Sequence, residues 1–339
     1  MPRELERDYL NALQSELASY QWRSTPDTIY LGGGTPSQID PESLEQLLSS
    51  IPGRPWNEAT MEAAPGSLTE SCVQAWRAVG INRVSLGVQS FAPRELARTG
   101  RKHRAETVAA DVELLRRNGI DRINIDLIAG LPGQTAESWG ESLNWIERLS
   151  PDHVSVYMLE VDEDSRLGRE ILAGGLRYGA SDTPGDDLIV ELYEAAVDRL
   201  ASLGLARYEI SNFARPGSES THNLKYWRLE PYAGFGADAH SFDGINRLQN
   251  VESASEYVDR WRAGQSAVCH SEPANPEQEC FFVGLRLIGG VRPATEDWLR
   301  FEEPIGRFIG EGLLERDSDV LRLTRRGVLL SNEVFSEFI

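Results

Sequence analysis

The sequence lacks several features that mark membrane, secreted or nucleic-acid-binding proteins. Its 339 residues contain no run of eighteen apolar residues, which excludes a membrane-spanning helix. The first twenty residues lack the basic–apolar–small pattern of a signal peptide, so we expect a cytoplasmic protein. Positive charge is scarce: only two of the 34 basic residues are lysines, and the net charge is −19. Such a surface repels nucleic acid and anionic lipid, so we expect no nucleic-acid partner.

Cysteine is also scarce. The chain has three cysteines, Cys72, Cys269 and Cys280. Their spacings fit no zinc or iron–sulfur pattern. We therefore expect three free thiols that are buried as small apolar groups, with no disulfide in a reducing compartment.

What the sequence does contain is a regular alternation of strand-like and helix-like segments. Apolar runs predict strands over 28–31, 59–63, 83–89, 122–128, 153–159 and 206–210. Helical patterns cover 41–50, 68–78, 105–118, 136–149 and 186–203. This order predicts an α/β fold with a parallel sheet and right-handed crossovers. Polar residues at the carboxyl ends of strands favour a partial (β/α) TIM-like barrel over a doubly wound sheet.

Both ends of this pattern are irregular. The opening helix, 4–20, has no strand before it, so the repeat looks as if it has lost its first strand. Residues 211–243 are rich in Gly, Asn, His and aromatics without periodicity, which predicts a long functional loop region. A helix over 253–263 follows. We predict a first domain over 1–268 and a second over 269–339.

The predicted second domain is small and mostly helical. Helical patterns cover 277–287, 295–301, 304–311 and 326–338, and a hairpin is predicted around Asp317-Ser-Asp319. This combination predicts a winged-helix-like cap.

Several motifs occur in a fixed order. They are GGGTP at 32–36, MEAAP at 61–65, NRVSLGVQSF at 82–91, GRKH at 100–103, NIDLIAGLPGQT at 124–135, HVSVYMLE at 153–160, THNLKYW at 221–227 and GFGADAHS at 234–241. In this order they resemble the radical S-adenosylmethionine proteins of the HemN/HemW group over essentially the whole chain. One departure is Ala64, where the group has Asn.

The resemblance implies a site for S-adenosylmethionine at the strand ends. Backbone groups at Gly33, Gly34 and Thr35 suit the amino-acid end of this ligand. The other implied residues are Glu62 and Asp126 for ammonium or ribose hydroxyls, Gln89 for the ribose, Arg101 for the carboxylate, and Tyr157 and Met158 beside the adenine. The alternative interpretation is that these are ordinary polar residues at strand ends.

The His-Asn-x-x-Tyr-Trp segment resembles the HemW-like branch, which implies haem binding and transfer to an acceptor protein. His222 would then ligate the iron through a neutral imidazole, and Tyr226 and Trp227 would pack on the porphyrin. The alternative is a histidine that only fixes the loop by hydrogen bonds. His240 and His153 are weaker candidates, and we expect His103 and His270 at the surface.

The resemblance also implies a [4Fe–4S] cluster, held in this group by a Cys-x3-Cys-x2-Cys loop shortly before the GGGTP strand. No cysteine precedes Gly32 here. Either the given sequence starts inside a longer protein, or the protein is a paralogue without a cluster. The retained ligand positions favour the first explanation, and Ala64 favours the second.

The expected function is therefore haem trafficking, with haem and S-adenosylmethionine as ligands. One alternative is an oxygen-independent coproporphyrinogen III oxidase, which removes carboxyl groups from porphyrinogen propionates by radical chemistry. Another is an inert or regulatory paralogue that binds neither ligand. The sequence leaves the haem acceptor, a homodimer and any enzymatic activity open.

Overall fold

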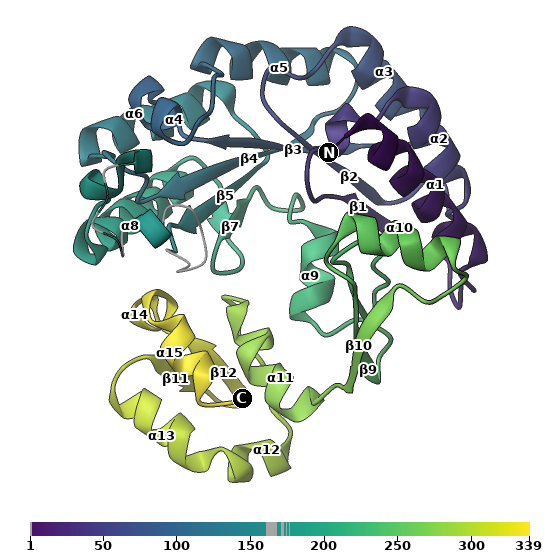
Figure 1. The fold of residues 1–339 in the computed structure, drawn as a ribbon. Coiled ribbons are helices and arrows are strands. Elements are labelled where there is room, and N and C mark those ends of the chain that lie inside the picture. The colour runs from purple at the N-terminus through teal and green to yellow at the C-terminus, as the bar shows by residue number, and fades with distance from the viewer. Residues whose placement is uncertain (1, 161–167, 171–172, 174, 176) are drawn as a thin grey trace. The chain divides into compact units, whose positions relative to one another are not determined.

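The computed structural model describes residues 2–160, 168–170, 173, 175 and 177–339 (Figure 1). The chain divides into two compact units. Unit 1 comprises Met1–Ile29, Ile39–Asn57 and Ser220–Ile339, and unit 2 comprises Tyr30–Gln38 and Glu58–Glu219. This division differs from the boundary that we placed at 268/269. Strand β10 (Val268–Pro273) pairs with β9 (Asn246–Asn250), so a boundary there would fall inside a strand. The boundary at 268/269 stays a prediction.

The main sheet has seven strands in the order β1-β2-β3-β4-β5-β7-β6. The strands are β1 (Thr28–Leu31), β2 (Glu58–Ala63), β3 (Arg83–Gln89), β4 (Arg122–Ala129), β5 (His153–Met158), β6 (Ala206–Arg207) and β7 (Asn212–Ala214). Strands β2 to β5 pair in parallel, as the sequence predicts. The predicted strand over 206–210 is shorter than expected, because the chain turns after β6 and returns as the unpredicted β7, antiparallel to both β5 and β6.

A layer of helices accompanies the parallel strands of unit 2 (Figure 1). It contains α3 (Glu70–Ala78), α5 (Ala105–Arg117), α6 (Ala136–Leu149) and α8 (Asp186–Ser202), and the short α4 (Pro93–Arg98) follows β3. Side-chain caps fix where two of these helices begin: Thr69 accepts from Cys72 N, and Thr135 forms a capping box with Ser138. The partial (β/α) barrel predicted from the sequence is confirmed.

Residues along the parallel strands alternate between apolar and polar side chains. In β3 and β4, buried Val84, Leu86, Ile123 and Ile125 alternate with Ser85 and Asn124. Successive side chains of a strand point to opposite faces, so each of these strands contributes one apolar and one polar face. The apolar face can pack against the apolar sides of the amphipathic helices. The polar face provides side chains that can bind a polar ligand.

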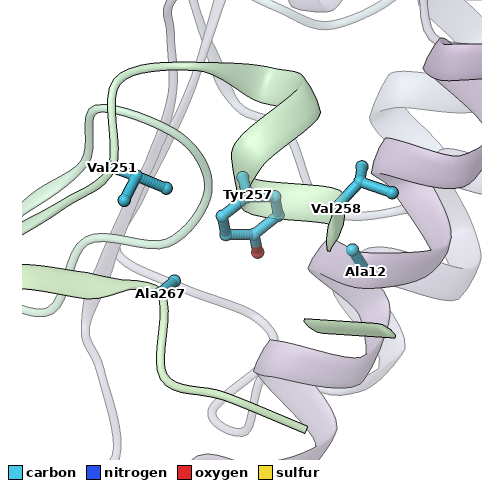
Figure 2. Close-up of a cluster of buried hydrophobic side chains, with 5 residues drawn as sticks. All are labelled: Ala12, Val251, Tyr257, Val258 and Ala267. Carbon is cyan, nitrogen blue, oxygen red and sulfur yellow. The ribbon is translucent and has the colours of Figure 1, made fainter. Parts of the chain in front are cut away.

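Unit 1 contains a small core around the opening helix. Helix α1 (Arg3–Ser19) lies beside α10 (Ala254–Arg262), and α2 (Pro41–Ser49) also belongs to this unit. Figure 2 shows the buried cluster of Ala12, Val251, Tyr257, Val258 and Ala267. The carboxylate of Glu16 accepts hydrogen bonds from the hydroxyl of Tyr257, the backbone N–H of Gly236 and the side chain of Asn250. These bonds join α1 to segments more than two hundred residues away.

The same unit holds β8 (His240–Phe242), β9 and β10 in a three-stranded antiparallel sheet, and helix α9 (Thr221–Trp227). Residues 211–243 therefore contain β7, α9 and β8, and the prediction of a loop without regular structure was wrong. Each of these elements has seven residues or fewer, which is too short to show a period in the sequence.

The C-terminal part of unit 1 is helical with one hairpin. Its elements are α11 (Pro276–Phe282), η3 (Gly284–Arg286), α12 (Thr295–Arg300), α13 (Glu302–Gly310), β11 (Leu314–Asp317), β12 (Val320–Leu323), α14 (Arg325–Leu329) and α15 (Ser331–Ser336). The predicted hairpin and winged-helix-like cap are confirmed, although two predicted helices are each split in two. The rings of Phe281 and Phe338 stack with centroids 4.5 Å apart, and Phe301 meets both edge-on.

None of the helices in the described part of the chain has the length and apolar character needed to cross a membrane.

Candidate functional site at the strand ends

The residues predicted to bind S-adenosylmethionine belong to unit 2 and lie at or near the carboxyl ends of successive strands. Glu62 pairs in register with Ser85, and Ser85 pairs with Asn124. Asp126 lies two residues further along β4, and Met158 ends β5. Parallel strands present their carboxyl ends at one edge, so the sheet brings these side chains to the same edge.

The carboxylate of Glu62 fixes the glycine turn after β1. Its Oε1 accepts from the hydroxyl of Tyr30 at 2.8 Å, and its Oε2 accepts from the backbone N–H of Gly33 at 3.2 Å. Gly33 and Gly34 have φ of 76° and 62°, which favours glycine. A Cβ on Gly32 would lie 2.8 Å from Tyr30 Cε1 and 3.0 Å from Glu62 Oε1. The turn therefore requires glycine for two reasons, conformation and close approach.

Burial and the Glu62 carboxylate raise the pKa of Tyr30 above its usual value, so its hydroxyl stays a donor. Thr35 follows the turn, and its carbonyl accepts from Gln38 N at 3.0 Å.

Gln89 and Arg101 lie beside a bulge at the end of β3. The register with β4 shifts between Leu86 and Gln89, and Gln89 has φ of 70°. Its buried Oε1 has no hydrogen-bond partner among the described residues. Arg101 donates from Nη1 to the carbonyl of Gly87 at 2.8 Å. Burial lowers the pKa of Arg101, and the carboxylate of Asp126 opposes that shift. A buried acceptor without a partner is what a polar ligand would complete.

Asp126 is the centre of the polar face. Its Oδ2 accepts from Ser85 Oγ at 3.0 Å, and its Oδ1 accepts from Asn124 Nδ2 at 2.7 Å. Burial raises the pKa of Asp126, while hydrogen bonds from Ser155, Ser85 and Asn124 lower it. Tyr157, 43% exposed, precedes the half-buried Met158. The supporting residues Ser85, Asn124 and Ser155 are absent from the predicted set, although their alternation along β3 to β5 is a signal that could have identified them.

His222 lies on α9 of unit 1 with both ring nitrogens hydrogen-bonded. Its Nδ1 is 2.9 Å from Thr28 Oγ1, and its Nε2 is 2.8 Å from the hydroxyl of Tyr226. Burial raises the pKa of Tyr226 to about 12. This arrangement agrees with the alternative to iron ligation given above, in which the histidine fixes the surrounding segment by hydrogen bonds. Iron could bind either nitrogen only after one of these two bonds breaks.

The neighbours of His222 hold α9 in place. The guanidinium carbon of Arg286 lies 4.5 Å from the ring centroid of Trp227. The rings of Tyr226 and Tyr232 meet edge-on at 4.6 Å. Lys225 pairs with Asp27 and with Glu230, each at 3.1 Å. The aromatic pair predicted to face a porphyrin is therefore already in contact with protein groups.

The remaining histidines fall into distinct environments. His153 is 1% exposed, which leaves no ring face for a porphyrin. His240 is exposed, with Nδ1 3.1 Å from the carbonyl of Asp238. His270 is exposed, as predicted. The prediction of a surface position for His103 was wrong: its Nε2 lies 3.1 Å from the carbonyl of Val88, and burial and Arg101 lower its pKa.

Comparison with known proteins places this geometry in a family. The family model of the radical SAM superfamily matches residues 9–146. "Heme chaperone HemW" of Bacillus subtilis is 33% identical over 355 residues, covering 98% of this chain and 91% of that protein. HemW of Escherichia coli is 34% identical over 348 residues, covering 97% of this chain and 88% of that protein. The chain belongs to the HemW family.

A solved structure supports the fold of this HemW-family chain. The coproporphyrinogen III oxidase HemN of Escherichia coli, described as a radical SAM enzyme, matches with a TM-score of 0.81 at 21% identity. The match covers 99% of this chain and 84% of HemN. At this identity the likeness establishes the fold alone.

The three cysteines of this HemW-family chain are free, as predicted. Cys72 in α3 and Cys280 in α11 are half-buried, and burial raises the pKa of both thiols. Cys269 in β10 is exposed, so the prediction of burial was wrong there. No group of three His, Cys, Asp or Glu residues in the described ranges could hold a metal ion. A [4Fe–4S] cluster does not fit the residues of the described ranges.

Proposed function

We propose that this protein binds haem and hands it to an acceptor protein. The main support for the proposal is sequence similarity to proteins named haem chaperones, which extends over nearly the whole length of this chain and of those proteins. The THNLKYW segment at 221–227 adds to it, because helix α9 sets an imidazole and a phenol four residues apart on one helical face.

In this proposal His222 is the iron ligand. The hydrogen bonds of both ring nitrogens keep the imidazole oriented before haem arrives. A neutral imidazole nitrogen is the usual protein ligand of haem iron. The rings of Tyr226 and Trp227 supply apolar surface against the porphyrin.

We also propose that unit 2 binds S-adenosylmethionine. The residues that would hold it are Gly33, Gly34, Thr35, Glu62, Gln89, Arg101, Asp126 and Met158. The unpartnered Oε1 of Gln89 supports this, because a ribose hydroxyl would satisfy it. When bound, S-adenosylmethionine supplies the sulfonium centre that characterises the superfamily. The protein would orient the ligand in two ways. Arg101 would bind the ligand's carboxylate, and the carboxylates of Glu62 and Asp126 would accept hydrogen bonds from the ligand's ammonium or ribose hydroxyls.

The proposed partners are haem, S-adenosylmethionine and the haem acceptor. The three free thiols suit the cytoplasm, which we propose as the compartment. The acidic surface gives no support to a nucleic-acid partner. A homodimer stays a prediction.

The test of the haem proposal is a titration of the full chain with haem, followed by its Soret absorption. We expect one haem per chain and a loss of tight binding in His222→Ala. His270→Ala is the matched control, because that histidine is exposed at the surface, with Nε2 3.4 Å from a carboxylate oxygen of Glu272, and its loss should leave the affinity unchanged. A full chain that binds no haem, or binds it equally well after His222→Ala, contradicts the proposal.

Coproporphyrinogen III oxidase activity is the alternative. It shares the fold, and the fold alone does not favour one function over the other. If the purified chain decarboxylates coproporphyrinogen under anaerobic, reducing conditions, its activity is that of the oxidase and not haem transfer.

A further inference from the structure

A line of hydrogen bonds crosses the polar face of unit 2 and ends at Asp126. The hydroxyl of Tyr208 is 2.8 Å from His153 Nε2, and His153 Nδ1 is 2.7 Å from Asn124 Oδ1. Asn124 Nδ2 is in turn 2.7 Å from Asp126 Oδ1. His153 and Asn124 are 1% and 5% exposed, so water does not compete freely for these bonds. The proposed haem and S-adenosylmethionine contacts do not include His153, Tyr208 or Asn124.

The charge at one end fixes the direction of the first two bonds in the line. An ionised carboxylate only accepts hydrogen bonds, so Asn124 must turn its NH₂ group toward Asp126. Its carbonyl then faces His153, which must carry its proton on Nδ1. The bare Nε2 accepts from the Tyr208 hydroxyl. Turning the Asn124 amide over would set two oxygens against each other at 2.7 Å.

A neutral imidazole fits this arrangement, because with its one proton on Nδ1 the ring leaves Nε2 to accept from the Tyr208 hydroxyl. Burial lowers the pKa of His153 well below its usual value, and the charge of Arg83 acts in the same direction. Asn124 Nδ2 also lies 2.8 Å from Ser85 Oγ and 3.0 Å from Ser155 Oγ. The amide is therefore surrounded by groups that hold it in one orientation.

We propose that His153 is a positioning residue for the S-adenosylmethionine site: fixed as the Nδ1–H tautomer by Tyr208 and Asn124, it holds the Asn124 amide, which aims the Asp126 carboxylate at the ligand. The inference rests on the proposed S-adenosylmethionine site. A carboxylate that is already aimed loses less rotational freedom when the ligand binds. Losing one such hydrogen bond should weaken the affinity about two- to tenfold.

The first experiment reads the histidine directly and needs no ligand. The chain has five histidines, so ¹⁵N-labelled imidazole signals can be assigned by comparison with single variants. We expect His153 to show a protonated Nδ1 and a bare Nε2, unchanged between pH 7 and pH 5. An Nε2–H tautomer, or an imidazolium at pH 7, would overturn the inference.

The second experiment separates the two ring nitrogens with matched variants. His153→Asn places an amide nitrogen where Nδ1 was and can still donate to Asn124. His153→Gln places its amide near the Nε2 position and loses that donor. We expect S-adenosylmethionine affinity close to wild type for His153→Asn and about two- to tenfold weaker for His153→Gln. Both variants must show wild-type circular dichroism before they are compared.

Equal affinities in the two variants would overturn the positioning role. If the wild-type chain binds no S-adenosylmethionine, the ligand site fails and the positioning role fails with it. The tautomer measurement keeps these cases distinct, because it reports on the hydrogen-bond line whether or not the ligand binds.

Discussion

Replacing Tyr226 with phenylalanine should tighten haem binding. In the structure the Tyr226 hydroxyl lies 2.8 Å from His222 Nε2, the nitrogen farther from the backbone. If iron binds Nε2, haem must first break this bond. Phenylalanine keeps the ring that contacts Trp227 and Tyr232 and removes only the hydroxyl.

The size of the effect follows from the one bond that is removed. A neutral hydrogen bond contributes about 0.5–1.5 kcal/mol net. The free energy that haem no longer spends on breaking it should raise the affinity about two- to tenfold. Haem titrations followed at the Soret band, on wild type and Tyr226→Phe in parallel, measure this change.

Thr28→Val is the matched control. It keeps the shape of the threonine side chain and removes the bond to His222 Nδ1, 2.9 Å away. With iron on Nε2, this variant should bind haem no more tightly than wild type. A gain for Thr28→Val without one for Tyr226→Phe would move the iron to Nδ1. Weaker binding in both variants would refute the reasoning, because it would mean that the two bonds support the ligand rather than compete with it.

Three further substitutions should have measurable effects. Glu95→Ala should lower the free energy of unfolding by about 3–5 kcal/mol in denaturant melts, because its buried carboxylate accepts from Ser90, Gln134 and Ser138; a loss under 1 kcal/mol would contradict this. Asp126→Asn should weaken S-adenosylmethionine binding about tenfold in calorimetry, and unchanged affinity would exclude Asp126 as a contact. Because burial lowers the pKa of His153, the unfolded state binds an extra proton below about pH 6.5, so stability should fall from pH 7 to pH 5 by more in wild type than in His153→Asn. Equal losses would show that another group is responsible.

The sequence predicted the parallel part of the fold well because each strand there is a short, mostly buried segment rich in apolar residues and bounded by helices. Strands β1 and β3 have the bounds predicted for them, and α6 does too. The short elements between 211 and 243 were missed, since α9 spans only seven residues and its pattern cannot show a helical period.

The predicted ligand residues at strand ends lie together because parallel strands all end at the same edge of the sheet. A residue's position along its strand is therefore enough to predict that it lies there. What could not be predicted is which side chains meet across the chain. The bond between Thr28 and His222 joins residues 194 positions apart. The partial burial of His103 has the same origin, because the carbonyl of Val88 that its ring meets belongs to a strand and not to its own segment. Tertiary contacts of this kind leave no local pattern.

The most direct test of the account is whether an imidazole at position 222 holds the iron. His222→Gly removes the ring and leaves room for free imidazole. We expect this variant to bind haem weakly, and added imidazole to restore the wild-type Soret position and the histidine–iron signature in electron paramagnetic resonance. The same wild-type spectrum in His222→Gly without imidazole would contradict the account, because the iron would then have another ligand.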